Sequence, residues 1–215
     1  ARLASVLAIA GRIAPTIVAT ERPPRIAFLD RYPWTTIDAD AGDALDACAT
    51  RLRLAGVEVI AVALPDALAD APSTHRTLML HEAVANLAHI ARGMLSPTLA
   101  HALAEGVAIE RSEYLRALAS RAAMRATATD WMANFDAVMS PATPGAAPAS
   151  LATTGDPACC TLWSLLGFPA IALPIGIGAS RMPLGMQLAS TQDHDDSLLS
   201  VAAWVEARLP FRGLP

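Results

Sequence analysis

Two hydrophobic spacings recur along the chain, and they predict alternating strands and helices. Short apolar runs predict five strands, at 26–29, 57–64, 137–139, 170–174 and 184–189. Apolar residues three or four positions apart predict helices, at 1–14, from 38 or 40 to 56, from 74 or 75 to 93, at 112–134, at 158–166 and from about 191 to 209. The fold class is therefore predicted as α/β.

The clearest strand–helix–strand unit covers residues 25–64. Asp38 or Asp40 can cap its helix, and Gly56 can adopt the left-handed conformation that ends helices. The run 57–64 is rich in valine and fits a buried parallel strand. A unit of this kind places two parallel strands side by side beneath a helix.

The sequence pattern predicts the buried face of the helix at 112–134 and the cap of the last helix, from about 191 to 209. The helix at 112–134 is predicted to face inward with Tyr114, Leu115, Leu118, Ala122 and Trp131, and outward with Arg116, Arg121 and Arg125. The last helix is predicted to be capped by Thr191 or Asp193. Asp195 and Asp196 then lie near its positive end, where carboxylates are favourable.

The segment 136–190 is the most apolar part of the chain, and no charged residue lies between Asp156 and Arg181. It could be a membrane span, the middle of a buried sheet or the lining of a ligand cavity. Pro169 and Pro174 would each remove a backbone hydrogen bond that lipid cannot replace. A short helix, a turn at 167–169 and a strand fit better, so no membrane span is predicted.

Composition limits the chemistry and the partners. The chain of 215 residues carries a net charge of −4, without the clustered basic surface typical of nucleic-acid binders. All 16 basic residues are arginine, so no lysine can act as a base or form a Schiff base. Cys48 and the adjacent Cys159 and Cys160 are not a disulfide framework, which favours small buried side chains and a reducing, cytoplasmic location.

The residues alone indicate no metal site, cofactor site or catalytic set. His81 and His89 are eight positions apart, whereas a zinc pair on a helix needs a spacing of four. Gly176 and Gly178 follow a strand, but position 181 is arginine, so the dinucleotide-binding fingerprint is incomplete. The chain also lacks the G-x-S-x-G pattern of a nucleophile elbow.

The order of three motifs nevertheless resembles the C-terminal half of the amidase signature family, which includes the A subunit of glutamyl-tRNA amidotransferase. The motifs are 136–144 (DAVMSPATP), 161–176 (TLWSLLGFPAIALPIG) and 182–188 (MPLGMQL). The unit 25–64 and the helix containing Glu82 match in order and spacing, so the resemblance covers essentially all of 1–215 as a single domain.

The resemblance implies part of a mixed, twisted sheet covered by helices. It also implies amide hydrolysis by a Ser–cis-Ser–Lys triad, in which a lysine made neutral by burial acts as the base. This chain has no lysine and no Gly/Ser-rich nucleophile loop, so no catalytic residue can be assigned. The family places a pocket wall at five positions, of which Trp163 is the sharpest candidate: Pro141, Thr143, Thr161, Trp163 and Ser164.

The sequence therefore predicts an amidase-type hydrolase, represented here by a C-terminal portion that is inactive alone and whose partner is a small amide. Two alternatives are a non-catalytic degenerate or binding homologue and one component of a split amidase or amidotransferase. A truncated sheet should expose an edge at 26–29 or at 170–174 and favour self-association.

Overall fold

Five strands form one mixed sheet within the residues that the computed structural model describes, which are 22–90, 92–209 and 211. The spatial order is β2 (Glu58–Ala61), β1 (Arg25–Phe28), β3 (Ala137–Pro141), β5 (Pro183–Ala189) and β4 (Ala170–Ile177). β1 runs parallel to β2 and β3, whereas β5 runs antiparallel to β3 and β4. The α/β class and the mixed sheet are confirmed; the predicted helix 1–14 lies outside the described residues.

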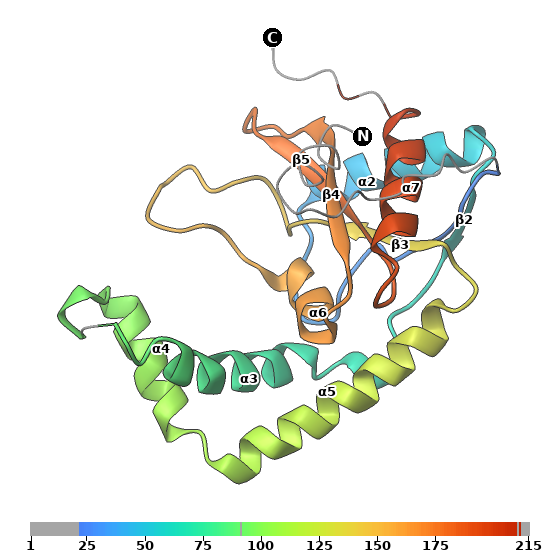
Figure 1. The fold of residues 1–215 in the computed structure, drawn as a ribbon. Coiled ribbons are helices and arrows are strands. Elements are labelled where there is room, and N and C mark those ends of the chain that lie inside the picture. Colours follow the sequence, from blue (N-terminus) through green and yellow to red (C-terminus); the bar gives the residue numbers. More distant parts are fainter. Residues whose placement is uncertain (1–21, 91, 210, 212–215) are drawn as a thin grey trace.

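Helices cover both faces of this sheet (Figure 1). One face packs against α2 (Ala39–Leu54) and α7 (Asp195–Glu206). The other packs against α3 (Ala71–Asn86), α5 (Arg111–Met132) and α6 (Ala158–Leu166). Successive side chains of β3 point to opposite faces of the sheet, so Met139 joins the hydrophobic core on the α2 side and Val138 joins the core on the α5 side. α4 (Pro97–Ala108) packs on α3 away from the sheet, and the short 3₁₀ turns are Asp66–Leu68 and Arg92–Met94.

The edges of the sheet differ from the expectation in one respect. β4 is an edge strand, as predicted for 170–174, but β1 is interior, with β2 on one side and β3 on the other. The run 57–64 contributes only the short strand β2, which is parallel to β1 but lies at the opposite edge with Glu58 and Ala61 exposed. The strand that is buried on both faces is therefore β1 and not the run 57–64, because its neighbouring strands and both helical layers exclude water from β1.

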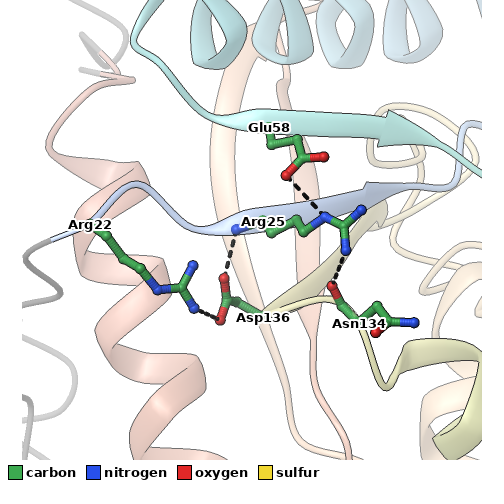
Figure 2. Close-up of polar contacts among 5 residues, drawn as sticks. All are labelled: Arg22, Arg25, Glu58, Asn134 and Asp136. Carbon is green, nitrogen blue, oxygen red and sulfur yellow. Dashed lines mark hydrogen bonds and ion pairs between the residues drawn. The ribbon is translucent and has the colours of Figure 1, made fainter.

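The amino ends of three strands are joined by a polar cluster, which we call the Arg25–Asp136 clasp (Figure 2). The Asp136 carboxylate accepts hydrogen bonds from the Arg25 backbone N–H (2.6 Å) and from Arg22 Nη2 (2.8 Å). The Arg25 guanidinium donates to the Asn134 carbonyl (3.1 Å), and its Nε lies 3.0 Å from Glu58 Oε2. The clasp thus connects β1 to β2 and β3.

Close packing of α3 against α4 depends on Gly106. A methyl group there would overlap the Leu80 carbonyl oxygen and lie 2.8 Å from Val84 Cγ2. We expect Gly106→Ala to lower the free energy of unfolding by about 1–3 kcal/mol, because overpacking forces the helices apart. Gly42→Ala in α2 is the matched control: its methyl group meets nothing within 4 Å. It should stabilise the protein by up to about 1 kcal/mol. Urea denaturation measures both, and equal effects would contradict the packing argument.

Candidate functional site

The carboxyl ends of β1 and β3 lie at the same edge of the sheet as the amino end of β5. Parallel strands deliver the residues that follow them to one edge, where α/β proteins generally bind ligands. Here the loop 142–157 follows β3 and leads into α6. Gln187 of β5 lies opposite Ser140 of β3, so the antiparallel strand brings its own side chains to this edge.

A buried set of four polar side chains, the Tyr32 network, lies beneath this edge. The Tyr32 hydroxyl donates to Ser140 Oγ (2.9 Å) and accepts from Trp163 Nε1 (3.0 Å) and from Gln187 Nε2 (3.3 Å). All four residues are buried. Burial disfavours the phenolate and raises the pKa of Tyr32, so the tyrosine stays neutral and acts as a hydrogen-bonding hub rather than a base.

Gln187 extends the network to the backbone of two elements. Its Nε2 also donates to the Pro141 carbonyl (2.9 Å) and to the Cys159 carbonyl (2.7 Å). Trp34 Nε1 donates to the neighbouring Ala158 carbonyl (3.1 Å). The end of β3 and the start of α6 are therefore fixed to each other from inside the core.

Four of the five predicted pocket residues lie along this junction with different exposures. Pro141 is buried as the last residue of β3. Thr143 is exposed in the following loop, where its hydroxyl donates to the Gly145 carbonyl (2.7 Å). On α6, Thr161 is half-buried and donates to the Pro157 carbonyl (3.1 Å), and Ser164 is exposed one turn later.

Trp163, the fifth, points to the interior. Its side chain is 1% exposed, and its N–H is bound by Tyr32. The structure thus places Pro141 and Thr143 at the carboxyl edge, Thr161 in the first turn of α6 and Trp163 beneath that helix, whereas Ser164 lies further along α6. Their role as a pocket wall stays a prediction.

Sequence reasoning missed three members of the Tyr32 network: Tyr32, Ser140 and Gln187. Ser140 and Gln187 were inside recognised motifs but had no assigned role. Their position could have indicated a buried network: Gln187 carries an amide and Ser140 a hydroxyl among the apolar residues of predicted strands. Such polar groups need hydrogen-bond partners when they are buried.

The adjacent cysteines of α6 are held as thiols. Burial raises the pKa of Cys159 to about 12, and the charges of Cys160 and Asp156 act in the same direction. Burial also raises the pKa of Cys160, whose thiol lies 3.4 Å from the Ala142 carbonyl. A thiolate nucleophile at this edge is therefore disfavoured. Across the described ranges, no group of three His, Cys, Asp or Glu residues could hold a metal ion.

Two surface hollows flank the sheet. One of about 560 Å³ lies at the carboxyl edge and is lined by Asp30, Arg31 and Pro65 among others. The larger, about 680 Å³, lies at the amino edge beside Asp136 and His194. Neither is lined by a predicted pocket residue, and we place the candidate site at the carboxyl edge because those residues and the Tyr32 network meet there. No helix within the described part of the chain is long and apolar enough to cross a membrane.

Comparison with known proteins gives a match to the Amidase family model over residues 4–199. The chain is 27% identical over 200 residues to 2-amino-5-chloromuconic acid deaminase of Comamonas testosteroni, covering 85% of this chain and 43% of the relative. It is 41% identical over 51 residues to the A subunit of the mitochondrial glutamyl-tRNA(Gln) amidotransferase of Drosophila pseudoobscura pseudoobscura, covering 24% of this chain and 10% of the relative.

Solved structures share the fold. A crystal structure of an amidase superposes with a TM-score of 0.77 at 24% identity, covering 90% of this chain and 48% of that one. A substrate complex of 6-aminohexanoate cyclic dimer hydrolase gives 0.74 at 18% identity, covering 92% and 48%. The chain therefore spans less than half the length of each of these four proteins.

Proposed function

Because the chain belongs to the amidase family, we propose that it forms part of an amidase-type hydrolase, which converts a carboxamide and water to a carboxylic acid and ammonia. The observation that carries this proposal is the family match over residues 4–199. The position of Pro141 and Thr143 at and just after the carboxyl end of β3 supports it, since ligands of α/β proteins bind at such edges.

The proposed role of this chain is to build the wall of the amide pocket. Pro141, Thr143, Thr161 and Ser164 would face a small amide, and Trp163 would hold α6 against the Tyr32 network. The chain contains no lysine, so it cannot supply the base of the Ser–cis-Ser–Lys triad that the family uses. We propose that the triad comes from another segment or another chain.

The purified 215-residue chain is expected to release no ammonia from small aliphatic or aryl amides. Without the lysine base and the activated serine, the pocket wall cannot lower the barrier to amide hydrolysis. A coupled ammonia assay across a range of chain concentrations measures this. Turnover above the blank that rises with chain concentration would show that these residues carry a complete catalytic set.

A second candidate is one component of a split amidase or of an amidotransferase. The similarity to the A subunits of glutamyl-tRNA(Gln) amidotransferases favours it. Sequencing the coding region upstream of Ala1 discriminates between the candidates. An in-frame segment with a lysine and a Ser-Ser loop supports a continuous amidase, and a separate reading frame carrying them supports a split enzyme. If neither an in-frame segment nor a separate reading frame of this kind is found, a non-catalytic binding homologue is supported.

The isolated chain is expected to self-associate. β4 lies at the edge of the sheet, and its residues Ala170, Ala172 and Pro174 are exposed. An unpaired strand with exposed apolar residues is a template for pairing with another chain. Size-exclusion chromatography at several concentrations should show species larger than a monomer. A monomer that persists at every concentration would argue against an incomplete sheet.

A further inference from the structure

The first residue of the α2 region uses its side chain in an unusual way. Asp38 occupies the N-cap position of α2, where an aspartate normally accepts a hydrogen bond from a backbone N–H of the first turn. Its side chain makes no such bond. The helix thus begins without side-chain capping, and the carboxylate is directed to a different part of the molecule.

The carboxylate lies instead against the loop 142–157. A methyl group on Gly145 would overlap Asp38 Oδ2 and lie 2.7 Å from its Cγ, so Asp38 occupies the space of a side chain at position 145. The Asp38 backbone N–H donates to the Pro144 carbonyl (2.8 Å). The Thr143 hydroxyl donates to the Gly145 carbonyl (2.7 Å). Three consecutive loop residues are therefore held by the residue that precedes α2 and by their own turn.

Asp40, two positions later, makes a parallel contact with a second loop. Its Oδ2 accepts a hydrogen bond from the Ala179 backbone N–H (2.6 Å) in the turn between β4 and β5. Both loops lie at the carboxyl edge of the sheet, where α2 also begins. The start of α2 consequently contacts two of the loops at this edge.

We propose that Asp38 is a positioning residue for the wall of the amide pocket: by filling the space beside Gly145, it fixes the loop that carries Thr143. This proposal rests on the proposed function, because it takes Thr143 to face the amide. Asp38 contacts no reacting atom in this scheme. It acts through the loop, so its loss should weaken amide binding more than it slows the chemical step.

The first arm of the test needs no activity. Hydrogen exchange of the 215-residue chain is compared for Asp38→Ala, Gly145→Ala and the double variant. Each single change should speed exchange of two amides about tenfold or more, because it removes the contact or forces the loop away: that of residue 38, which donates to the Pro144 carbonyl, and that of Ala142, which donates to the Gly185 carbonyl. The double variant should be close to Asp38→Ala, since the added methyl group then meets only the Cβ of residue 38, at 3.3 Å, in place of the carboxylate. Asp38→Asn keeps the shape and should restore slow exchange. Asp43→Ala removes an exposed carboxylate of the same helix and should change nothing.

The second arm uses the enzyme completed by the segment or chain that carries the lysine. Asp38→Ala and Gly145→Ala should raise KM for the amide about tenfold with kcat within about twofold, and the two effects should not add.

The two arms separate the possible failures. Unchanged exchange of the residue 38 and Ala142 amides would overturn the positioning role of Asp38, whatever the activity. Faster exchange with an unchanged KM would show that the loop is anchored by Asp38 but does not face the amide, which overturns this proposal alone. Faster exchange with no amide hydrolysis by any completed form would overturn the proposed function.

Discussion

Replacing Trp163 with alanine is expected to lower the free energy of unfolding by about 3–5 kcal/mol, the range for large aromatic side chains removed from a core. Trp163 is 1% exposed and packs within the core cluster on the α5 and α6 side of the sheet. The change would leave a cavity under α6 and would remove the indole donor from the Tyr32 hydroxyl. The loss therefore combines a large buried surface with a buried hydrogen bond.

One further variant separates the contribution of packing from that of the hydrogen bond, and a second serves as a control. Trp163→Phe fills most of the cavity but lacks the N–H, and it should cost about 1–3 kcal/mol. Leu151→Ala removes a fully exposed leucine of the loop 142–157 and should change the free energy of unfolding by less than about 0.5 kcal/mol. Urea denaturation monitored by far-UV circular dichroism gives all three values. A loss below about 1 kcal/mol for Trp163→Ala would mean that the indole lines an open pocket instead of the core.

The second large effect is expected at Gln187. Gln187→Leu keeps the approximate size of the side chain but removes the side-chain donor to the buried Pro141 and Cys159 carbonyls. Each buried acceptor that loses its partner costs about 1–3 kcal/mol, so we expect a destabilisation of about 2–4 kcal/mol in denaturant titrations.

The matched control is Gln192→Leu, at an exposed position beyond β5. It should have an effect below about 0.5 kcal/mol. The Gln187 and Trp163 variants should not add, because both residues bond to Tyr32. An additive double variant would mean that the two side chains stabilise the fold independently.

The sequence was sufficient to predict helix ends that are set by one or two neighbouring residues. The helix predicted at 158–166 has the same bounds as α6, because Gly167 ends it with a left-handed backbone (φ 65°). Gly56 ends the α2 region with φ 86°. These predictions succeeded because the deciding residues are neighbours in the sequence.

Predictions that required the phase of a helix were less reliable. In α5, Leu115 is 50% exposed and Ala122 is exposed, whereas the buried residues are Ala117, Met124, Ala128 and Met132. Arg125, expected on the outer face, donates to the Leu166 carbonyl (2.8 Å). The reason is the abundance of alanine on every side of this helix, which leaves little contrast between its faces. The cap of α7 was also wrong: His194 is the N-cap, and Asp193 has a positive φ of 64°.

The motif order predicted the candidate site residues, but the hydrogen bonds that support this edge could not be derived from the sequence. The motifs brought Pro141 and Trp163 to one edge because homologous order implies homologous position. Tyr32 and Gln187 are 155 positions apart, and no pattern in either segment specifies their hydrogen bond. The contact between Asp38 and Gly145 could not be predicted either. An aspartate before a helix is explained locally as a cap, and a glycine in a loop is explained locally by the turn, so neither residue indicates the other.

The Arg25–Asp136 clasp has a consequence for how fast the chain can fold. The hydrogen bond from the Arg25 backbone N–H to the Asp136 carboxylate joins residues 111 positions apart, so β3 can pair with β1 only after a long intervening segment has been brought together. Closing such a loop costs chain entropy before the sheet returns any stabilisation, and folds dominated by distant pairings fold slowly. The β4–β5 hairpin and the β1–α2–β2 unit can form early from local contacts. We therefore expect their union through β3 to be the slow step of folding, and the clasp lies at that junction.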